Sequence, residues 1–359
     1  MAPSKGRRKF LGGLLAAGVI PRPTWADAGS PSFLSAAAGL DGSYVLCGIG
    51  DDLTVRFELP LPARGHAAAA HPMRPEAVAF ARRPGTFAVV IDCRNGAQVA
   101  MLTSPEGRHF YGHGAFSSDG SVLFTTENDY EAGAGRVGLW DVRNGYRRIG
   151  EWDSGGIGPH DIKRLPGSDV LVVANGGIDT HPDSGRTKLN IATMQPNLAY
   201  IDSGQVVEVA QLPANMRKNS IRHLAVRGDG MVGFGMQWQG DGHPSALVGV
   251  HQRGTTAKLL WADEAETRGM DGYIGSIAFS SAGDRVAVTS PRGGVLQLYD
   301  VDAGQLVAAT QMEDVCGVAT VGRHFAATTG GGEMRRLQGV TSIHKAQTDL
   351  MWDNHLVKI

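Results

Sequence analysis

A glycine that recurs between two β-rich runs is the feature that most constrains the fold of this chain. Each of these glycines lies in a short turn and precedes an apolar run of strand-forming residues, for example 170–173 or 285–288. Successive glycines are 35 to 63 residues apart, a spacing typical of repeats with four strands per unit. The glycines are Gly42, Gly85, Gly120, Gly167, Gly230, Gly283 and Gly322.

Seven such units predict an all-β fold, a seven-bladed β-propeller with four antiparallel strands per blade. A single blade cannot bury both of its faces, so blades stack around an axis until the ring closes. We expect residues 355–359 to supply the closing strand in the first or the last blade, and residues 176–197 to form the one large insertion. A pair of β-sandwiches is the alternative. A sandwich does not require units of similar length, so the recurring spacing favours the propeller.

The first residues predict an export signal rather than part of the fold. Arg7 and Arg8 form a twin-arginine pattern, residues 11–20 are weakly apolar, and Ala26-Asp27-Ala28 is typical of a cleavage site. A membrane anchor is the alternative, and it would need about 20 apolar residues. We therefore expect residues 1–28 to be a twin-arginine signal peptide, 29–359 to be a single propeller domain, and the protein to be periplasmic.

Charge and cysteine content narrow the classes of partner. Without residues 1–28 the formal net charge is −5, which argues against a nucleic-acid partner or an anionic membrane surface. No other apolar run is long enough to span a membrane, so no transmembrane segment is expected in the mature protein. Three cysteines do not make a disulfide scaffold, and whether Cys47 and Cys93 pair in an oxidising compartment stays open.

Candidate metal ligands recur where the innermost strands begin. In a propeller these strands all start at one face and line one channel, so equivalent side chains converge there. In the sixth unit Tyr273 has the position equivalent to these ligands, and in the second unit His71 or Glu76 could take it. Imidazole together with thiolate or carboxylate suits iron, copper or zinc, and we predict an iron or copper ion. The predicted metal ligands are His113, His160, His223 and Cys316.

A second set of polar residues lies on the loops that return to the same face. We predict that this set binds a small ligand, and it comprises Glu127, Asn128, Asp129, Asn175, His181, Arg222, Gln237 and Arg292. The alternative is structural: each histidine bonds within the core, and the acidic loop is a solvated rim. The sequence has no close-spaced pair of metal ligands, so the metal prediction rests on the convergence of distant residues in the fold. It also has no nucleophile elbow, phosphate loop or dinucleotide fingerprint, and this favours a binding protein over an enzyme.

Several longer motifs resemble one known family. Gly112-His113-Gly114, Gly158-Pro159-His160-Asp161 and the runs 124–131, 173–183, 220–225 and 289–294 are similar to those of domain of unknown function 1513 (DUF1513). The resemblance implies a twin-arginine-exported, seven-bladed propeller. It also implies, by association only, a role in iron acquisition with imelysin-type iron-uptake proteins as partners. The family supplies no catalytic residues.

Three hypotheses for function follow. The first is a periplasmic binding module that holds a metal ion or small anionic ligand at the axial mouth, or docks a partner of an iron-acquisition system there. The second is a periplasmic enzyme, a lactonase-like hydrolase or an oxidoreductase, that uses the same mouth. The third is a protein–protein scaffold without a small-molecule site. The sequence leaves the ligand, the partner and the oligomeric state open.

Overall fold

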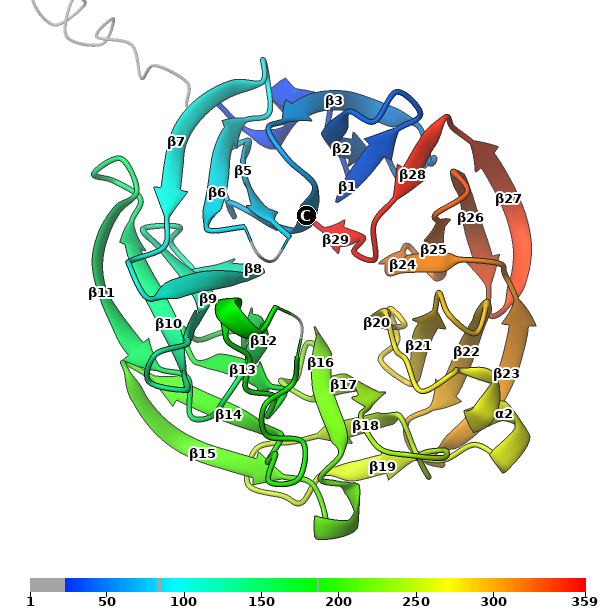
Figure 1. Cartoon of the computed structure of the whole chain (residues 1–359). Helices are drawn as coiled ribbons and strands as arrows, with labels where there is room; N and C mark the ends of the chain where they lie inside the picture. Colours follow the sequence, from blue (N-terminus) through cyan, green and yellow to red (C-terminus); the bar gives the residue numbers. More distant parts are fainter. Residues whose placement is uncertain (1–22, 83–84, 186) are drawn as a thin grey trace, which may run out of the picture.

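The chain forms a ring of seven β-sheets around a central axis (Figure 1). The structure, a computed structural model, describes residues 23–82, 85–185 and 187–359. Each sheet is antiparallel and has four strand positions, with its innermost strand facing the axis. The predicted seven-bladed β-propeller is therefore confirmed. The twin-arginine pattern lies outside the described residues.

The strands follow one another blade by blade. The first blade contains β1 (Phe33–Gly39), β2 (Tyr44–Ile49), β3 (Val55–Leu61), β28 (Leu350–Trp352) and β29 (Val357–Lys358). The second contains β4 (Gly65–Ala70), β5 (Glu76–Ala81), β6 (Phe87–Asp92) and β7 (Ala97–Thr103). The third contains β8 (Arg108–Phe116), β9 (Val122–Asp129), β10 (Ala134–Asp141) and β11 (Arg147–Asp153). The fourth contains β12 (Pro159–Arg164), β13 (Leu171–Asn175), β14 (Asn197–Asp202) and β15 (Gln205–Gln211).

The remaining blades and the short helices complete the ring. The fifth blade contains β16 (Asn219–Val226), β17 (Val232–Trp238), β18 (Val248–His251) and β19 (Lys258–Leu260). The sixth contains β20 (Ser276–Phe279), β21 (Arg285–Ser290), β22 (Val295–Asp300) and β23 (Gln305–Gln311). The seventh contains β24 (Val315–Val321), β25 (His324–Thr329), β26 (Glu333–Gln338) and β27 (Thr341–Gln347). The helices within the described residues are η1 (Trp25–Ala28), η2 (Pro182–Ser184), η3 (Ala214–Met216) and α2 (Glu264–Gly269).

The recurring glycine turns have a clear local cause. In the turn between β8 and β9, Gly120 has a φ of +69°, a backbone conformation that glycine adopts without steric cost. The Asp119 carboxylate accepts hydrogen bonds from the backbone N–H and the hydroxyl of Ser121, at 2.9 and 2.7 Å. The apolar side chains of the strands then pack between blades, as Phe80 of β5 does against Phe110 of β8.

The C-terminal segment closes the ring in the first blade. In the β1–β29 pair, Leu34 lies opposite Val357, and in the β1–β28 pair, Ala37 lies opposite Trp352. The segment between these two short strands is also held, because the Ser35 hydroxyl donates to the carbonyl oxygen of His355 at 2.8 Å. The predicted closing strand is confirmed. Strand β28, which precedes it in the chain, pairs with the same strand, β1.

The insertion and the cysteines are also placed. Residues 176–196 join β13 to β14, and η2 lies within this loop, as expected for the insertion. Cys47, Cys93 and Cys316 are free and buried. No helix in residues 23–82, 85–185 and 187–359 is long and apolar enough to cross a bilayer.

The residues around the predicted cleavage site have a defined structure. The indole N–H of Trp25, in η1, donates to the carbonyl oxygen of His71 at 3.0 Å, and Ala28 is buried. The predicted domain boundary after residue 28 therefore falls at the end of η1, which packs on the second blade.

His71 makes the stability of the second blade sensitive to acid. Its Nδ1 accepts hydrogen bonds from the backbone N–H groups of Met73 and Arg74, at 3.1 and 3.0 Å, so this imidazole must be neutral. Burial, together with the charge of Arg74, lowers its pKa to about 4. Between this value and the ordinary value of 6.5 the unfolded chain binds a proton that the folded chain excludes, so stability is lost as pH falls through that window.

We therefore expect the replacement His71→Asn to cost stability at pH 7 and progressively less toward pH 4. The carboxamide oxygen keeps an acceptor near Met73 and Arg74 but does not titrate. The free-energy difference between the two proteins should shrink by on the order of 3 kcal/mol across the window. Urea unfolding at a series of pH values measures it, and a difference that is constant with pH would contradict the assignment.

Candidate metal centre

The innermost strands are irregular where they approach the axis. The register of β4, β8, β12, β16 and β24 against their neighbours shifts, whereas β20 pairs with β21 without a shift. A β-bulge re-aims side chains and interrupts the alternation of a strand. The residues at or beside the five shifts include His66, His113, His160, His223 and Cys316.

Five histidines from five blades meet on the axis. The ring centroids of neighbouring members are 4.6 to 6.3 Å apart. Four of the five residues are no more than 8% exposed. We call this group the histidine cluster, and its members are His66, His113, His160, His223 and His355. It contains all three of the predicted metal-binding histidines.

The histidine cluster contains two overlapping triads with the spacing of a metal site. His66, His113 and His160 each offer a ring nitrogen within 4.8 Å of the other two, and so do His113, His223 and His355. Metal–nitrogen bonds are about 2.0–2.1 Å long for zinc, so nitrogens within 4.8 Å of one another need only a small inward shift of the rings to share one ion. His113 belongs to both triads and is the residue that links them.

Hydrogen bonds orient two of the imidazoles toward the centre. The Nδ1–H of His113 donates to the carboxylate of Asp161 at 3.1 Å, and that of His160 donates to the carbonyl oxygen of Arg222 at 3.1 Å. Acceptors at Nδ1 leave Nε2 as the nitrogen with the free lone pair. A carboxylate behind a histidine is the arrangement that commonly orients metal-binding imidazoles.

Several ring nitrogens of the histidine cluster lack a hydrogen-bond partner among the described residues. They are Nδ1 of His66, Nε2 of His113, both nitrogens of His223 and Nε2 of His355, and Nδ1 of His66 lies 3.7 Å from the carboxylate of Asp353. Buried polar atoms are nearly always paired in folded proteins, because leaving one unpaired costs free energy. Unpaired nitrogens at the centre of the channel are the arrangement that a metal ion would satisfy.

The environment keeps the imidazoles in the form that binds metal. Burial lowers the pKa of His113 to about 4, even though Asp161 acts in the opposite direction. Burial and neighbouring cations also hold the pKa of His160, His223 and His355 well below the ordinary value. Burial alone would raise the pKa of Asp161, but Lys163 and His113 outweigh it and keep this carboxyl ionised.

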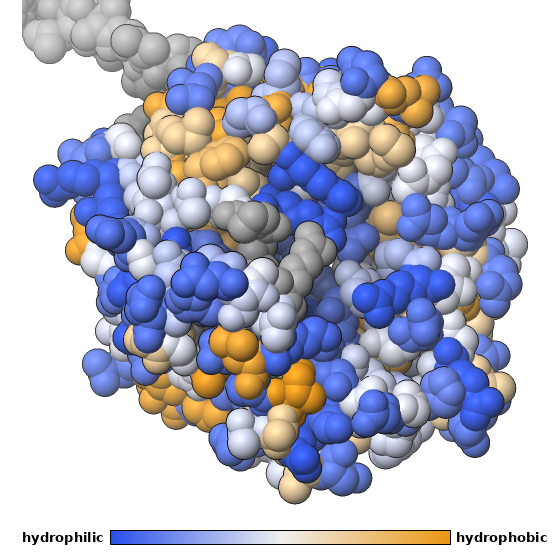
Figure 2. Space-filling view, viewed as in Figure 1, coloured by the Kyte–Doolittle hydropathy of each residue, from blue (hydrophilic) through white to orange (hydrophobic). Residues whose placement is uncertain are grey.

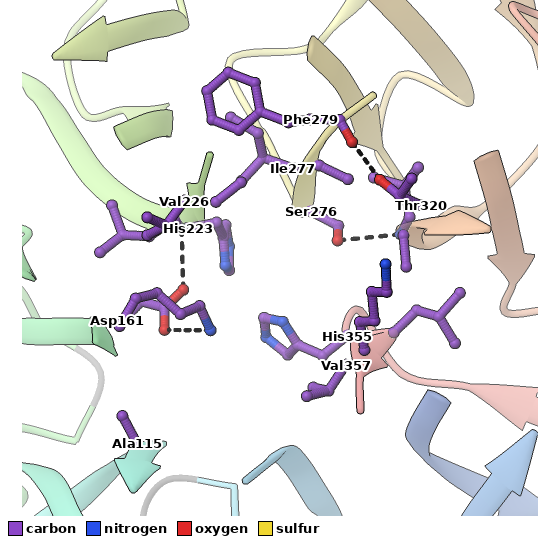
Figure 3. A pocket seen from close by; sticks show the side chains of 18 of the residues that line it. Ala115, Asp161, His223, Val226, Ser276, Ile277, Phe279, Thr320, His355 and Val357 are labelled. Carbon is purple, nitrogen blue, oxygen red and sulfur yellow. Dashed lines mark hydrogen bonds and ion pairs between the residues drawn. The ribbon is translucent and has the colours of Figure 1, made fainter. Parts of the chain in front are cut away.

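Two cavities flank the histidine cluster. One, of about 390 Å³, begins at His66, His160 and His223, and we call it the cationic pocket because four basic side chains also line it. The other, of about 450 Å³, is lined by short segments of six innermost strands and reaches His223 and His355. Figure 3 shows both of these imidazoles at this second cavity, beside Asp161. The histidine cluster therefore separates two cavities in the axial channel.

Three residues predicted to bind a small ligand line the cationic pocket. Arg222 lies in the bulge of β16, Gln237 lies on β17, and Arg292 lies in the loop between β21 and β22. The guanidinium of Arg292 stacks on the ring of Tyr273, with its central carbon 4.6 Å from the ring centroid. Figure 2 shows hydrophilic side chains around the hollow at the centre of one face of the ring.

The acidic residues of the predicted ligand set lie elsewhere. Strand β9 continues to Asp129, so Glu127 and Asp129 belong to a strand rather than to a loop at the mouth. Glu127 is fully buried and accepts a hydrogen bond from Arg148 at 2.6 Å, whereas Asp129 accepts one from Arg136 at 3.3 Å. These carboxylates hold the outer strands of the third blade together.

The remaining predicted residues also have local partners outside the histidine cluster. The Asn128 amide donates to the carbonyl oxygen of Thr180 at 3.0 Å, and Asn175 bonds to Ser154. His181 caps η2. The thiol of Cys316 donates to the carbonyl oxygen of Asp314 at 3.2 Å, and burial raises the pKa of that thiol. Cys316 belongs to neither triad.

Sequence reasoning missed His66 and His355. The second blade presents His66 to the axis, whereas His71 and Glu76 lie at the turn between β4 and β5. The dipeptide Gly65-His66 matches Gly112-His113, and this match was the available signal. His355 follows no repeat pattern, because it lies between the two short strands that close the ring.

Comparisons with known proteins place the chain in a family and a fold. A chain in the solved structure "Kuenenia stuttgartiensis Hydrazine Synthase" has a TM-score of 0.63 at 13% identity, and the match covers 93% of this chain and 98% of that one. BamB from Moraxella catarrhalis has a TM-score of 0.55 at 12% identity, covering 88% of this chain and 82% of that one. Likeness at this identity shows the fold alone.

No curated protein has a matching sequence. The family match covers residues 59–359, a range that contains the whole histidine cluster. The chain thus belongs to the family described as protein of unknown function (DUF1513).

Proposed function

We propose that this protein is a metal-binding propeller in which the histidine cluster holds an iron or copper ion. The observation that carries the proposal is the convergence of five imidazoles from five blades, with unpaired nitrogens at the centre. Imidazole donors suit copper, iron, zinc and nickel, and neutral imidazoles bind without first losing a proton. Asp161 holds His113 in the tautomer that presents Nε2.

A metal titration tests this function. The purified full-length chain is freed of metal and dialysed against Cu(II), Fe(II) or Zn(II) at pH 7, and bound metal is measured. We expect at least one ion per chain for copper or iron, since affinity for nitrogen donors rises toward copper in the first transition series. A chain that takes up none of the three metals would refute the proposal.

We propose that the setting is periplasmic iron acquisition, with an imelysin-type protein as partner. This part rests on the twin-arginine pattern at Arg7 and Arg8 and on the family resemblance. The double replacement of both arginines by lysine keeps the charge but removes the recognised pattern, so the protein should accumulate in the cytoplasm. Cell fractionation measures this, and periplasmic double mutant would contradict the export route.

A further inference from the structure

The cationic pocket presents an electrostatic problem for a metal site. Arg82, Lys188, Arg222 and Arg292 line it, and no carboxylate lines it among the described residues. Arg82 is paired with Asp353 at 3.3 Å. Among the described residues Lys188 and Arg292 contact the neutral side chains of Gln239 and Tyr273 and form no ion pair with a carboxylate. A positive cavity repels a free metal cation and attracts an anion.

The second cavity offers no better route for a bare cation. Its basic residues are Lys163, Arg227 and Lys358, and its one carboxylate, Asp161, already contacts Lys163 and His113 at 3.1 Å. Both approaches to the histidine cluster are therefore basic. A metal ion would reach the cluster more readily as part of a negatively charged complex.

The basic groups of the cationic pocket come from different parts of the ring. Arg82 follows β5 of the second blade, Lys188 lies in the insertion of the fourth, Arg222 lies on β16 of the fifth, and Arg292 follows β21 of the sixth. Burial lowers the pKa of Lys188, and the neighbouring charges of Arg222 and Arg292 lower it further. Cations spread over a cavity of about 390 Å³ suit an anion with several charged groups better than a single small oxyanion.

Further donors in the same cavity suit carboxylate groups. Trp238 lines the cavity, and its indole nitrogen is buried without a hydrogen-bond partner among the described residues. Gln237, Gln239 and Tyr273 add neutral polar groups. Arginine and lysine make charge-assisted hydrogen bonds to carboxylates, and these are stronger than bonds between neutral groups.

We propose that the cationic pocket binds a small anion with two or more carboxylate groups, next to the histidine cluster. Where the proposed metal function holds, this anion would supply oxygen ligands at the positions that a histidine triad leaves open. The three histidines shared with the pocket, His66, His160 and His223, place the anion and the metal side by side. The anion site itself needs no metal and is testable without it.

Calorimetry with citrate and with inorganic phosphate tests this site on the metal-free full-length chain at pH 7. We expect citrate to bind and phosphate to bind at least tenfold more weakly. The replacements Lys188→Gln and Arg292→Gln should each weaken citrate binding by roughly ten- to a hundredfold, because each removes one charge-assisted interaction. Both side chains are exposed, so the variants should fold, and the exposed Arg323→Gln is the matched control that should bind normally.

The outcomes separate this inference from the metal function. Citrate binding without metal uptake would support the pocket and refute the metal site, whereas metal uptake without citrate binding would do the reverse. Phosphate binding as tight as citrate binding would overturn the polycarboxylate assignment. So would a loss of citrate affinity in Arg323→Gln as large as in the two pocket variants. If both ligands bind, each should tighten the other by the same factor, since coupling between two sites is reciprocal.

Discussion

A chain that ends at Asn354 is expected to melt roughly 10–20 °C below the full-length protein. In a domain of this size, each kcal/mol lost from the free energy of unfolding lowers the melting temperature by about 2–4 °C or less. The truncation removes β29, which pairs with Phe33 and Leu34 of β1, and the buried side chain of Leu356. It leaves the start of β1 as an unpaired edge, although β28 still pairs with Ala37–Gly39, and it weakens the contact between the first and last blades. Scanning calorimetry of the metal-free proteins measures the difference.

The matched control for the truncation is Lys358→Ala. The side chain of Lys358 is exposed, so this variant keeps the β1–β29 backbone pairing and should melt like the parent. A truncated chain with an unchanged melting temperature would mean that β28 alone closes the ring.

The replacement His113→Ala is expected to weaken metal binding by at least about a hundredfold. Replacing a residue that only hydrogen-bonds to a metal ligand typically lowers metal affinity about 10- to 100-fold, and loss of the ligand itself should cost more. His113 is common to both triads, so its loss leaves neither complete. His66→Ala disrupts one triad and leaves His113, His223 and His355 in place, so its effect should be smaller. Equilibrium dialysis with Cu(II) or Fe(II) measures both effects.

The coupling between replacements distinguishes a shared ion from independent structural roles. If His113 and His223 hold one ion, the double alanine variant should bind little worse than His113→Ala alone. The control is His344→Ala, which removes an exposed histidine of β27 and should leave metal binding unchanged. Additive losses in melting temperature with unaltered metal content would instead identify the histidines as structural.

The sequence determined the fold, the closing strand and three members of the histidine cluster. Six of the seven turn glycines have a left-handed backbone like that of Gly120 and lie between the first two strands of a blade, so most units can be counted along the chain. The exception is Gly85, which lies between β5 and β6. The innermost strand of each unit then has a known place at the axis. His113, His160 and His223 could therefore be predicted to lie near one another.

The tertiary structure alone decided the composition of the site. Bulges in the innermost strands decide which side chain turns to the axis, and these bulges are seen only in the pairing of the folded strands. Glu127 is acidic and near the expected loop, but Arg148 of a distant strand holds it inside its own blade. His355 reaches the axis because the chain closes its ring there, a contact between ends 320 residues apart that no local pattern encodes.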